Sequence, residues 1–139
     1  MIGASAALSI SDIPFGGPTA AVAVGYVNDE IIINPTEEQR KNSRLTLTVA
    51  GTKDKIAMIE AGADEIPDDI MLEAIKKAHK EIKKLCTFIG KMKKEIGKTK
   101  FEYKSFAVNE EIYAEVEKEY KSKMYEAVQA CLLYTSDAA

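Results

Sequence analysis

Residues 44–50 alternate between apolar side chains and smaller or polar ones, and this period of two constrains the fold more than any other feature of the chain. Leu45, Leu47 and Val49 fall on one side of the segment, while the residues between them are threonine or alanine. Such alternation is typical of a β-strand that packs one face against a core. A single strand cannot bury that face alone, so the pattern requires neighbouring strands and a covering layer.

Three further segments supply the neighbouring strands. Residues 20–27 are almost continuously apolar, which predicts a strand buried on both faces. The pair Asn28-Asp29 is a tight-turn signal between this strand and a second one at 30–34. A fourth strand is expected at 55–62. We therefore predict an antiparallel β-meander over residues 20–62.

Helical segments are expected before, between and after these strands in the sequence. Residues 2–11 are small and apolar, and Thr36 is placed to cap a short helical turn. Residues 67–96 form a long amphipathic pattern, with Pro67 and two aspartates at its start and Gly97 as a stop. Its expected buried face consists of Ile70, Ala74, Ala78, Ile82, Leu85, Ile89, Met92 and Ile96.

The residues that follow this helix are expected to form a separate segment. Residues 98–108 are predicted to be extended, with Phe101, Tyr103 and Phe106 as anchors, and Asn109 is expected to cap a helix over residues 110–131. The buried side of that helix is predicted to hold Ile112, Val116, Tyr120, Ala127 and Val128. The fold class is therefore α+β, an antiparallel sheet packed on helices and followed by a helical segment.

Composition narrows the functional classes. The chain has 139 residues, of which 46% are hydrophobic and 29% charged, as expected for a soluble globular domain. Its formal net charge of −3 gives no global electrostatic argument for nucleic-acid binding. No apolar run has the length of about 20 residues that spans a bilayer, so no membrane association is expected. Cys86 and Cys131 match no metal or redox spacing, which favours reduced thiols in the cytoplasm.

The strongest candidate for binding is a lysine-rich helix face. From Lys76 to Lys104 there are eleven lysines against three glutamates. Lysines so placed are suited to RNA phosphates, although pairs such as Glu73–Lys77 and Lys91–Glu95 are also ordinary spacings on a solvated helix surface. The candidate RNA-binding residues are Lys76, Lys77, Lys80, Lys83 and Lys84, with Lys91 and Lys94 further along.

Three other features have simpler explanations. His79, the only histidine, has no second base or nucleophile at helical spacing, which favours a surface or boundary position. Residues 16–18, Gly-Gly-Pro, are more typical of a turn than of a phosphate cradle, because no helix starts behind them. Four acidic residues complement a helix start better than they form a cation site: Asp64, Glu65, Asp68 and Asp69.

A set of motifs at fixed spacing resembles one family. It includes Ile2–Ser11, Ile13-Pro14-Phe15-Gly16-Gly17-Pro18, Val24-Gly25-Tyr26, Asn34-Pro35-Thr36, Val49-Ala50-Gly51-Thr52, Ile59-Glu60-Ala61 and Met71–Ile75. In order and spacing these resemble bacterial polynucleotide phosphorylase over residues 2–85, and residues 98–131 resemble that family's helical linker domain. The resemblance implies that residues 1–97 are the C-terminal part of the first RNase PH-like domain, a partial fold of the type found in ribosomal protein S5 domain 2. It further implies that 98–131 start the linker and that 132–139 are a non-native tail.

The resemblance also implies an activity. Family members are homotrimers that degrade RNA from the 3′ end with inorganic phosphate, supported by Mg²⁺, in cytoplasmic mRNA turnover and RNA-degradation complexes. Their catalytic carboxylates, lysine and phosphate-binding serine lie in the second RNase PH-like domain, which we expect to be absent from this chain. In that domain the strand matching residues 45–51 carries an aspartate and a lysine where this chain has Thr46 and Thr48, and Ala23 stands where many members carry arginine.

We therefore expect no catalytic residue and no metal ligand in this chain, which would be a structural, RNA-proximal part of the enzyme, inactive alone. Two alternatives remain. One is a stand-alone RNase PH or exosome-type subunit. The other is an RNA-binding or scaffold module that acts through the lysine face.

Overall fold

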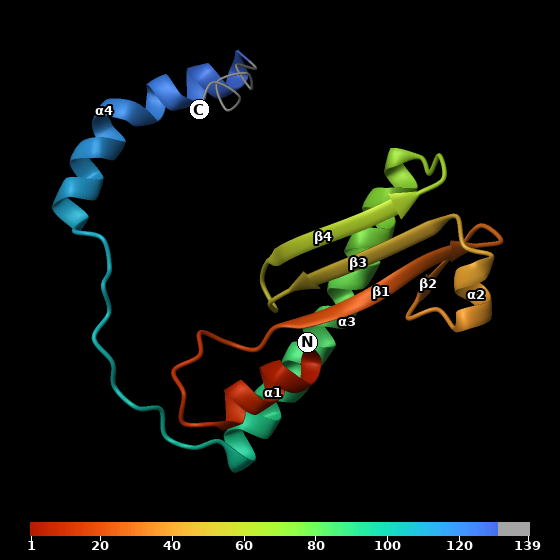
Figure 1. Cartoon of the computed structure of the whole chain (residues 1–139), viewed down its shortest axis with the longest axis horizontal. Helices are drawn as coiled ribbons and strands as arrows, with labels where there is room; N and C mark the ends of the chain where they lie inside the picture. Colours follow the sequence, from red (N-terminus) through yellow and green to blue (C-terminus); the bar gives the residue numbers. More distant parts are fainter. Residues whose placement is uncertain (131–139) are drawn as a thin grey trace. The chain divides into compact units, whose positions relative to one another are not determined.

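The computed structural model describes residues 1–130, which fall into two compact units: Met1–Glu102 and a second unit that begins at Tyr103. The expected tail at 132–139 and Cys131 lie outside the described residues. The elements, drawn in Figure 1, are α1 (Ile2–Ile10), β1 (Ala20–Val27), β2 (Glu30–Ile33), α2 (Glu37–Lys41), β3 (Leu45–Gly51), β4 (Ile56–Ala63), α3 (Asp68–Ile96) and, in the second unit, α4 (Glu110–Gln129).

The four strands form one antiparallel sheet in the order β2-β1-β3-β4, which confirms the α+β class. The predicted meander, in which each strand pairs with the next one in the sequence, was wrong in its strand order. Residues 24–27 of β1 pair with β2 on one side, while residues 20–25 of β1 pair with β3 on the other. The segment that contains α2 explains the difference, because it carries the chain from β2 past the end of β1 to the opposite side.

Local signals for turns and caps are confirmed. Asn28 and Asp29 have φ values of 50° and 60°, the left-handed conformation that a two-residue hairpin turn requires. Thr36 caps α2 through a capping box, in which its hydroxyl accepts a hydrogen bond from the Gln39 amide while the Gln39 side chain accepts one from the Thr36 amide. These short-range features are set by a few neighbouring residues, so the sequence is sufficient to find them.

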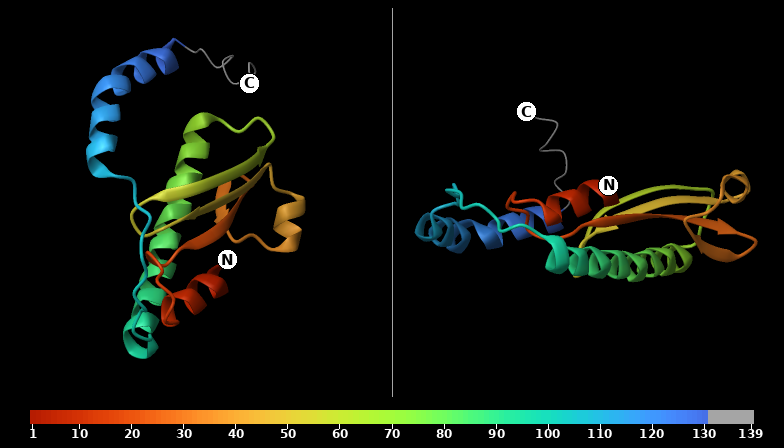
Figure 2. Two further views of the ribbon diagram at one scale, coloured as in Figure 1. Left: turned by 60° about the vertical axis from the view of Figure 1, so that its left-hand side comes forward. Right: turned by 90° about the horizontal axis from the view of Figure 1, so that it is seen from below.

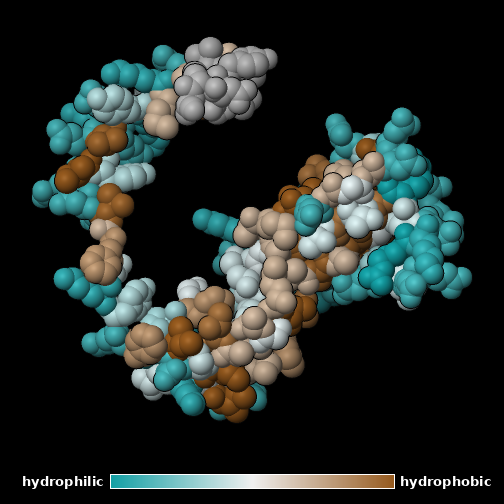
Figure 3. Space-filling view, in the orientation of Figure 1, coloured by the Kyte–Doolittle hydropathy of each residue, from teal (hydrophilic) through white to brown (hydrophobic). Residues whose placement is uncertain are grey.

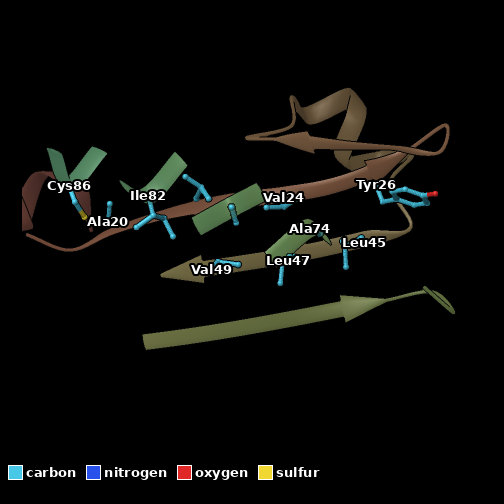
Figure 4. Packing of buried hydrophobic residues seen from close by; sticks show 11 residues of the cluster. Ala20, Val24, Tyr26, Leu45, Leu47, Val49, Ala74, Ile82 and Cys86 are labelled. Carbon is cyan, nitrogen blue, oxygen red and sulfur yellow. The ribbon is translucent and has the colours of Figure 1, made fainter. Parts of the chain in front are cut away.

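The core lies between the sheet and α3, which crosses one face of it (Figure 2). Figure 4 shows buried side chains of β1, β3 and α3 that belong to this cluster. Most of the predicted helix face is buried or half-buried, whereas Ile96 is 63% exposed. The helix contributes one buried residue that its predicted face lacked, Cys86. The core cluster consists of Ala20, Val22, Val24, Tyr26, Leu45, Leu47, Val49, Ala74, Ala78, Ile82 and Cys86, and Ala50 and Ile89 are also buried.

The second face of the sheet is open in the first unit. On β1 the buried residues alternate with half-buried ones such as Ala21 and Ala23, so the prediction of a strand buried on both faces was wrong. The physical reason is that α3 covers one face, whereas on the other face of β1 only Gly25 is buried, next to Pro35 and Ser43. Figure 3 shows apolar residues along this part of the surface.

The segment after α3 differs most from expectation. Phe101, Tyr103 and Phe106 are 54%, 68% and 92% exposed, so they are not anchors. The chain is held instead by polar contacts with the end of α1: the Lys98 amide donates to the Ile10 carbonyl, and the Lys100 ammonium donates to the Leu8 and Ser9 carbonyls at 3.0 Å.

Helix α4 begins at the predicted cap, where the Asn109 side chain accepts hydrogen bonds from the amides of Glu111 and Ile112. None of its residues is buried, so the predicted buried side is wrong in this structure. Its apolar residues face solvent because α4 is the only helix of the second unit within the described residues. No helix among the described residues has the length and hydrophobicity to cross a membrane.

Candidate nucleic-acid interface

All five candidate RNA-binding lysines are exposed on α3, but they are not equivalent. The Lys77 ammonium donates to the Ile31 carbonyl of β2 at 2.6 Å, and not to Glu73 as the helical spacing suggested. Lys84 forms an ion pair with Glu81 at 2.7 Å. No ion pair involves Lys76, Lys80 or Lys83 within the described part of the chain. The lysines available to an anionic partner are therefore chiefly these three.

An aromatic side chain extends this face. Phe88 is 62% exposed and lies in a shallow surface depression with Lys83, Lys84, Thr87 and Lys91. An exposed aromatic ring next to ammonium groups combines a stacking surface for a base with partners for phosphates. Phe88 could not be selected from the sequence, because an apolar residue in an amphipathic helix is usually part of the core.

A second basic feature is a cleft of about 530 Å³ at the C-terminal half of α3. One wall is the turn at residues 16–18, the other is the β3–β4 turn with Lys53, and α3 contributes Gly90, Lys91 and Lys94. The sequence predicts Gly16-Gly17 as a turn and identifies Lys91 and Lys94, but it does not connect them. Reasoning from the sequence did not select Lys53 or Gly90 as functional residues. The signal that could have found Gly90 is its position as a glycine inside a long helical pattern.

Two hydrogen bonds fix the walls of this cleft to α3. The Cys86 thiol donates to the Pro18 carbonyl at 3.4 Å, and the imidazole Nε2 of half-buried His79 lies 3.2 Å from the Thr52 carbonyl. His79 is therefore a boundary residue that holds a turn, as its sequence context favoured. Burial raises the pKa of the Cys86 thiol, so it remains a neutral donor at neutral pH.

The acidic cluster has structural roles. Asp68 and Asp69 occupy the first turn of α3, where they complement the positive end of the helix dipole. The backbone carbonyls of Asp64 and Glu65 accept hydrogen bonds from the Arg44 guanidinium at 3.1 and 3.3 Å. Among the described residues, no group of three or more acidic, histidine or cysteine side chains is arranged to hold a metal ion.

Thr46 and Thr48 lie on the open face of the sheet. Thr46 pairs with Gly25 and Gly62 on the neighbouring strands, and Thr48 pairs with Ala23 and Glu60. Thr46 is exposed and Thr48 half-buried. The only ionisable group opposite either threonine is Glu60. A pair of hydroxyl groups lacks the fixed negative charge that a hard cation prefers, and it lacks a cation for phosphate.

Comparison with known proteins identifies the class of this fold. Residues 17–81 match the 3′ exoribonuclease family, domain 2, so this part of the chain is similar to that domain. This match spans β1 to β4 and the first half of α3.

The relatives are more specific. The chain is 56% identical over 130 residues to the polyribonucleotide nucleotidyltransferase of Ruminiclostridium cellulolyticum. The aligned residues are 94% of this chain and 18% of that protein. It is 57% identical over 129 residues to the enzyme of the same name from Caldicellulosiruptor saccharolyticus, and 46% identical over its whole length to that of Lysinibacillus sphaericus. The sequence resemblance is thus confirmed, and the chain spans about a fifth of the length of these relatives.

Proposed function

We propose that this chain is a structural, RNA-proximal part of a 3′-to-5′ phosphorolytic exoribonuclease, polynucleotide phosphorylase, that acts in RNA degradation and mRNA turnover. The observation that carries the proposal is the similarity to polyribonucleotide nucleotidyltransferases over 94% of the chain. The complete enzyme would use Mg²⁺ and inorganic phosphate as cofactor and co-substrate, and this chain would bind neither for catalysis.

The organisation of the complete protein belongs to the same proposal. Residues 1–97 would form the C-terminal part of the first RNase PH-like domain, and 98–131 the start of the helical linker. Residues 132–139 would be a non-native tail. The enzyme would be a cytoplasmic homotrimer associated with an RNA-degradation complex.

The open sheet face supports a non-catalytic role. The strand that carries the reactive aspartate and lysine in the family's catalytic domain presents Thr46 and Thr48 here. Neither side chain supplies a fixed charge, and the neighbouring strand offers Ala23 and Gly25. Glu60 is the one carboxylate opposite these threonines, and a single carboxylate is fewer than the several oxygen ligands that Mg²⁺ takes, while no cation stands at either position to neutralise phosphate.

The isolated chain is therefore expected to release no ADP from poly(A) with phosphate and Mg²⁺. The measurement is quantification of ADP by ion-exchange chromatography after prolonged incubation, with a heat-treated sample as the background. Release of ADP above that background by the purified chain would show that it carries its own catalytic site.

RNA contact would involve the exposed lysines of α3. Lys76, Lys80 and Lys83 have no ion-pair partner among the described residues, and Lys84 and Lys77 lie on the same helix. This arrangement favours one further candidate, an RNA-binding or scaffold module that acts through this face independently of phosphorolysis. The stand-alone RNase PH alternative is less favoured, because the similarity to the longer enzymes continues beyond residue 97.

A further inference from the structure

We propose that the cleft between the Gly16-Gly17 turn and α3 is a phosphate-binding site, which adjoins the lysine face at Lys91. The proposal rests on the charge of the cleft, on its fixed walls and on the unusual position of Gly90. The ligand is a phosphate group, supplied by an RNA backbone or by inorganic phosphate.

The charge of the cleft suits an anion. Lys53, Lys91 and Lys94 line it, with Asp54 as the opposing carboxylate. No ion pair engages these three ammonium groups within the described residues. The lysines reach the cleft from two elements that are far apart in sequence, the β3–β4 turn and the end of α3. An excess of ammonium groups around one concave surface is what phosphate recognition requires.

The turn at residues 16–18 adds backbone donors. Gly17 has a φ of +143°, a conformation that side chains rarely tolerate. The amides of Gly16 and Gly17 donate no hydrogen bond within the described residues. Successive free amides in a glycine turn are a recurring element of anion sites. Because the Cys86 thiol ties Pro18 to α3, the turn is held in place before a ligand arrives.

The presence of glycine at position 90 is explained neither by helix propensity nor by packing within the chain. It lies inside α3, where glycine costs about 1 kcal/mol relative to alanine. A Cβ built at this position meets no atom within 4 Å, so close packing within the chain does not require glycine. Gly90 lines the floor of the cleft, where a longer side chain would occupy the space. The glycine therefore keeps the cleft open.

The test is a titration of the ¹⁵N-labelled chain with inorganic phosphate and, separately, with a short oligoadenylate, followed by the amide signals of Gly16 and Gly17. Gly90→Glu adds a carboxylate at the cleft, at a position where a Cβ meets no atom within 4 Å. Gly62→Glu is the matched control, since a Cβ at Gly62 also meets no atom within 4 Å and the charge change is identical. Circular dichroism establishes that both variants keep the fold.

We expect saturable shifts of these signals in the parent chain and in Gly62→Glu, and affinity about tenfold weaker in Gly90→Glu because of the introduced like charge. Saturation by phosphate alone would assign the site to the free anion, and saturation by oligoadenylate alone would assign it to the RNA backbone. Equal affinity in the two variants, or no saturable shift with either probe, would overturn the proposal. The double variant Lys76→Glu, Lys80→Glu distinguishes this site from the proposed RNA face. We expect it to bind phosphate at the cleft with the affinity of the parent chain, because neither lysine lines the cleft.

Discussion

Replacing Ile82 by alanine is expected to lower the free energy of unfolding by about 3 kcal/mol. Ile82 is completely buried in the middle of α3, where it packs against the sheet (Figure 4). The substitution removes three carbon atoms from a close-packed interface and leaves a cavity, so lost transfer energy and lost contacts add. For a unit of this size, whose total stability is of the order of 5–15 kcal/mol, this is a large fraction.

Urea denaturation followed by circular dichroism measures the change. Leu72→Ala is the matched control, because Leu72 belongs to the same helix but is 51% exposed. It should cost less than about 0.5 kcal/mol, since leucine and alanine have similar helix propensities and little burial is lost. Equal losses in the two variants would mean that α3 does not pack on the sheet through this face.

The second large effect concerns the lysine face. Changing Lys76, Lys80 and Lys83 together to glutamate should weaken the binding of single-stranded RNA by at least about tenfold at low salt, because three phosphate contacts become repulsive. The slope of log K against log salt should also fall in magnitude by about two, or about 0.7 for each lost contact. Fluorescence anisotropy with labelled oligoadenylate at several salt concentrations measures both quantities.

A charge-matched control removes the effect of net charge. Lys41 belongs to α2, and Lys118 and Lys123 belong to α4, so none of them is a residue of α3, and the same change to glutamate alters the net charge by the same amount. RNA binding by this control should stay close to that of the parent. If both triple variants lost the same affinity, the attraction would be a property of overall charge, and α3 would have no specific role.

The sequence predicted the features that neighbouring residues determine. The alternation of β3, the Asn28-Asp29 hairpin and the Thr36 cap depend on a few adjacent positions, and all three are confirmed. The strand order was missed because pairing of β3 with β1 depends on how the segment containing α2 crosses the sheet, which periodicity does not encode.

For the candidate sites too, the sequence predicts what neighbouring residues determine and misses contacts that form only on folding. Lysines on one helix share a face by spacing alone, so the lysine face was identified from sequence. Lys77 is not free to bind RNA because its ammonium donates to a backbone carbonyl of β2, 46 residues away in the sequence. This contact exists only after folding. The cleft likewise joins Lys53 of one turn with Gly90 of a helix. Helical spacing also predicted a buried side for α4, but a pattern does not supply the partner that would cover it.

A chimeric enzyme tests the central claim most directly, namely that this chain is a working but non-catalytic part of a polynucleotide phosphorylase. The 130 residues of the Ruminiclostridium cellulolyticum protein that align with this chain would be replaced by those of this chain, and ADP release from poly(A) would be measured with phosphate and Mg²⁺. We expect a rate close to that of the parent enzyme, since on the proposed function the reactive groups would lie outside the exchanged segment. A chimera that folds and assembles like the parent but releases no ADP would contradict it.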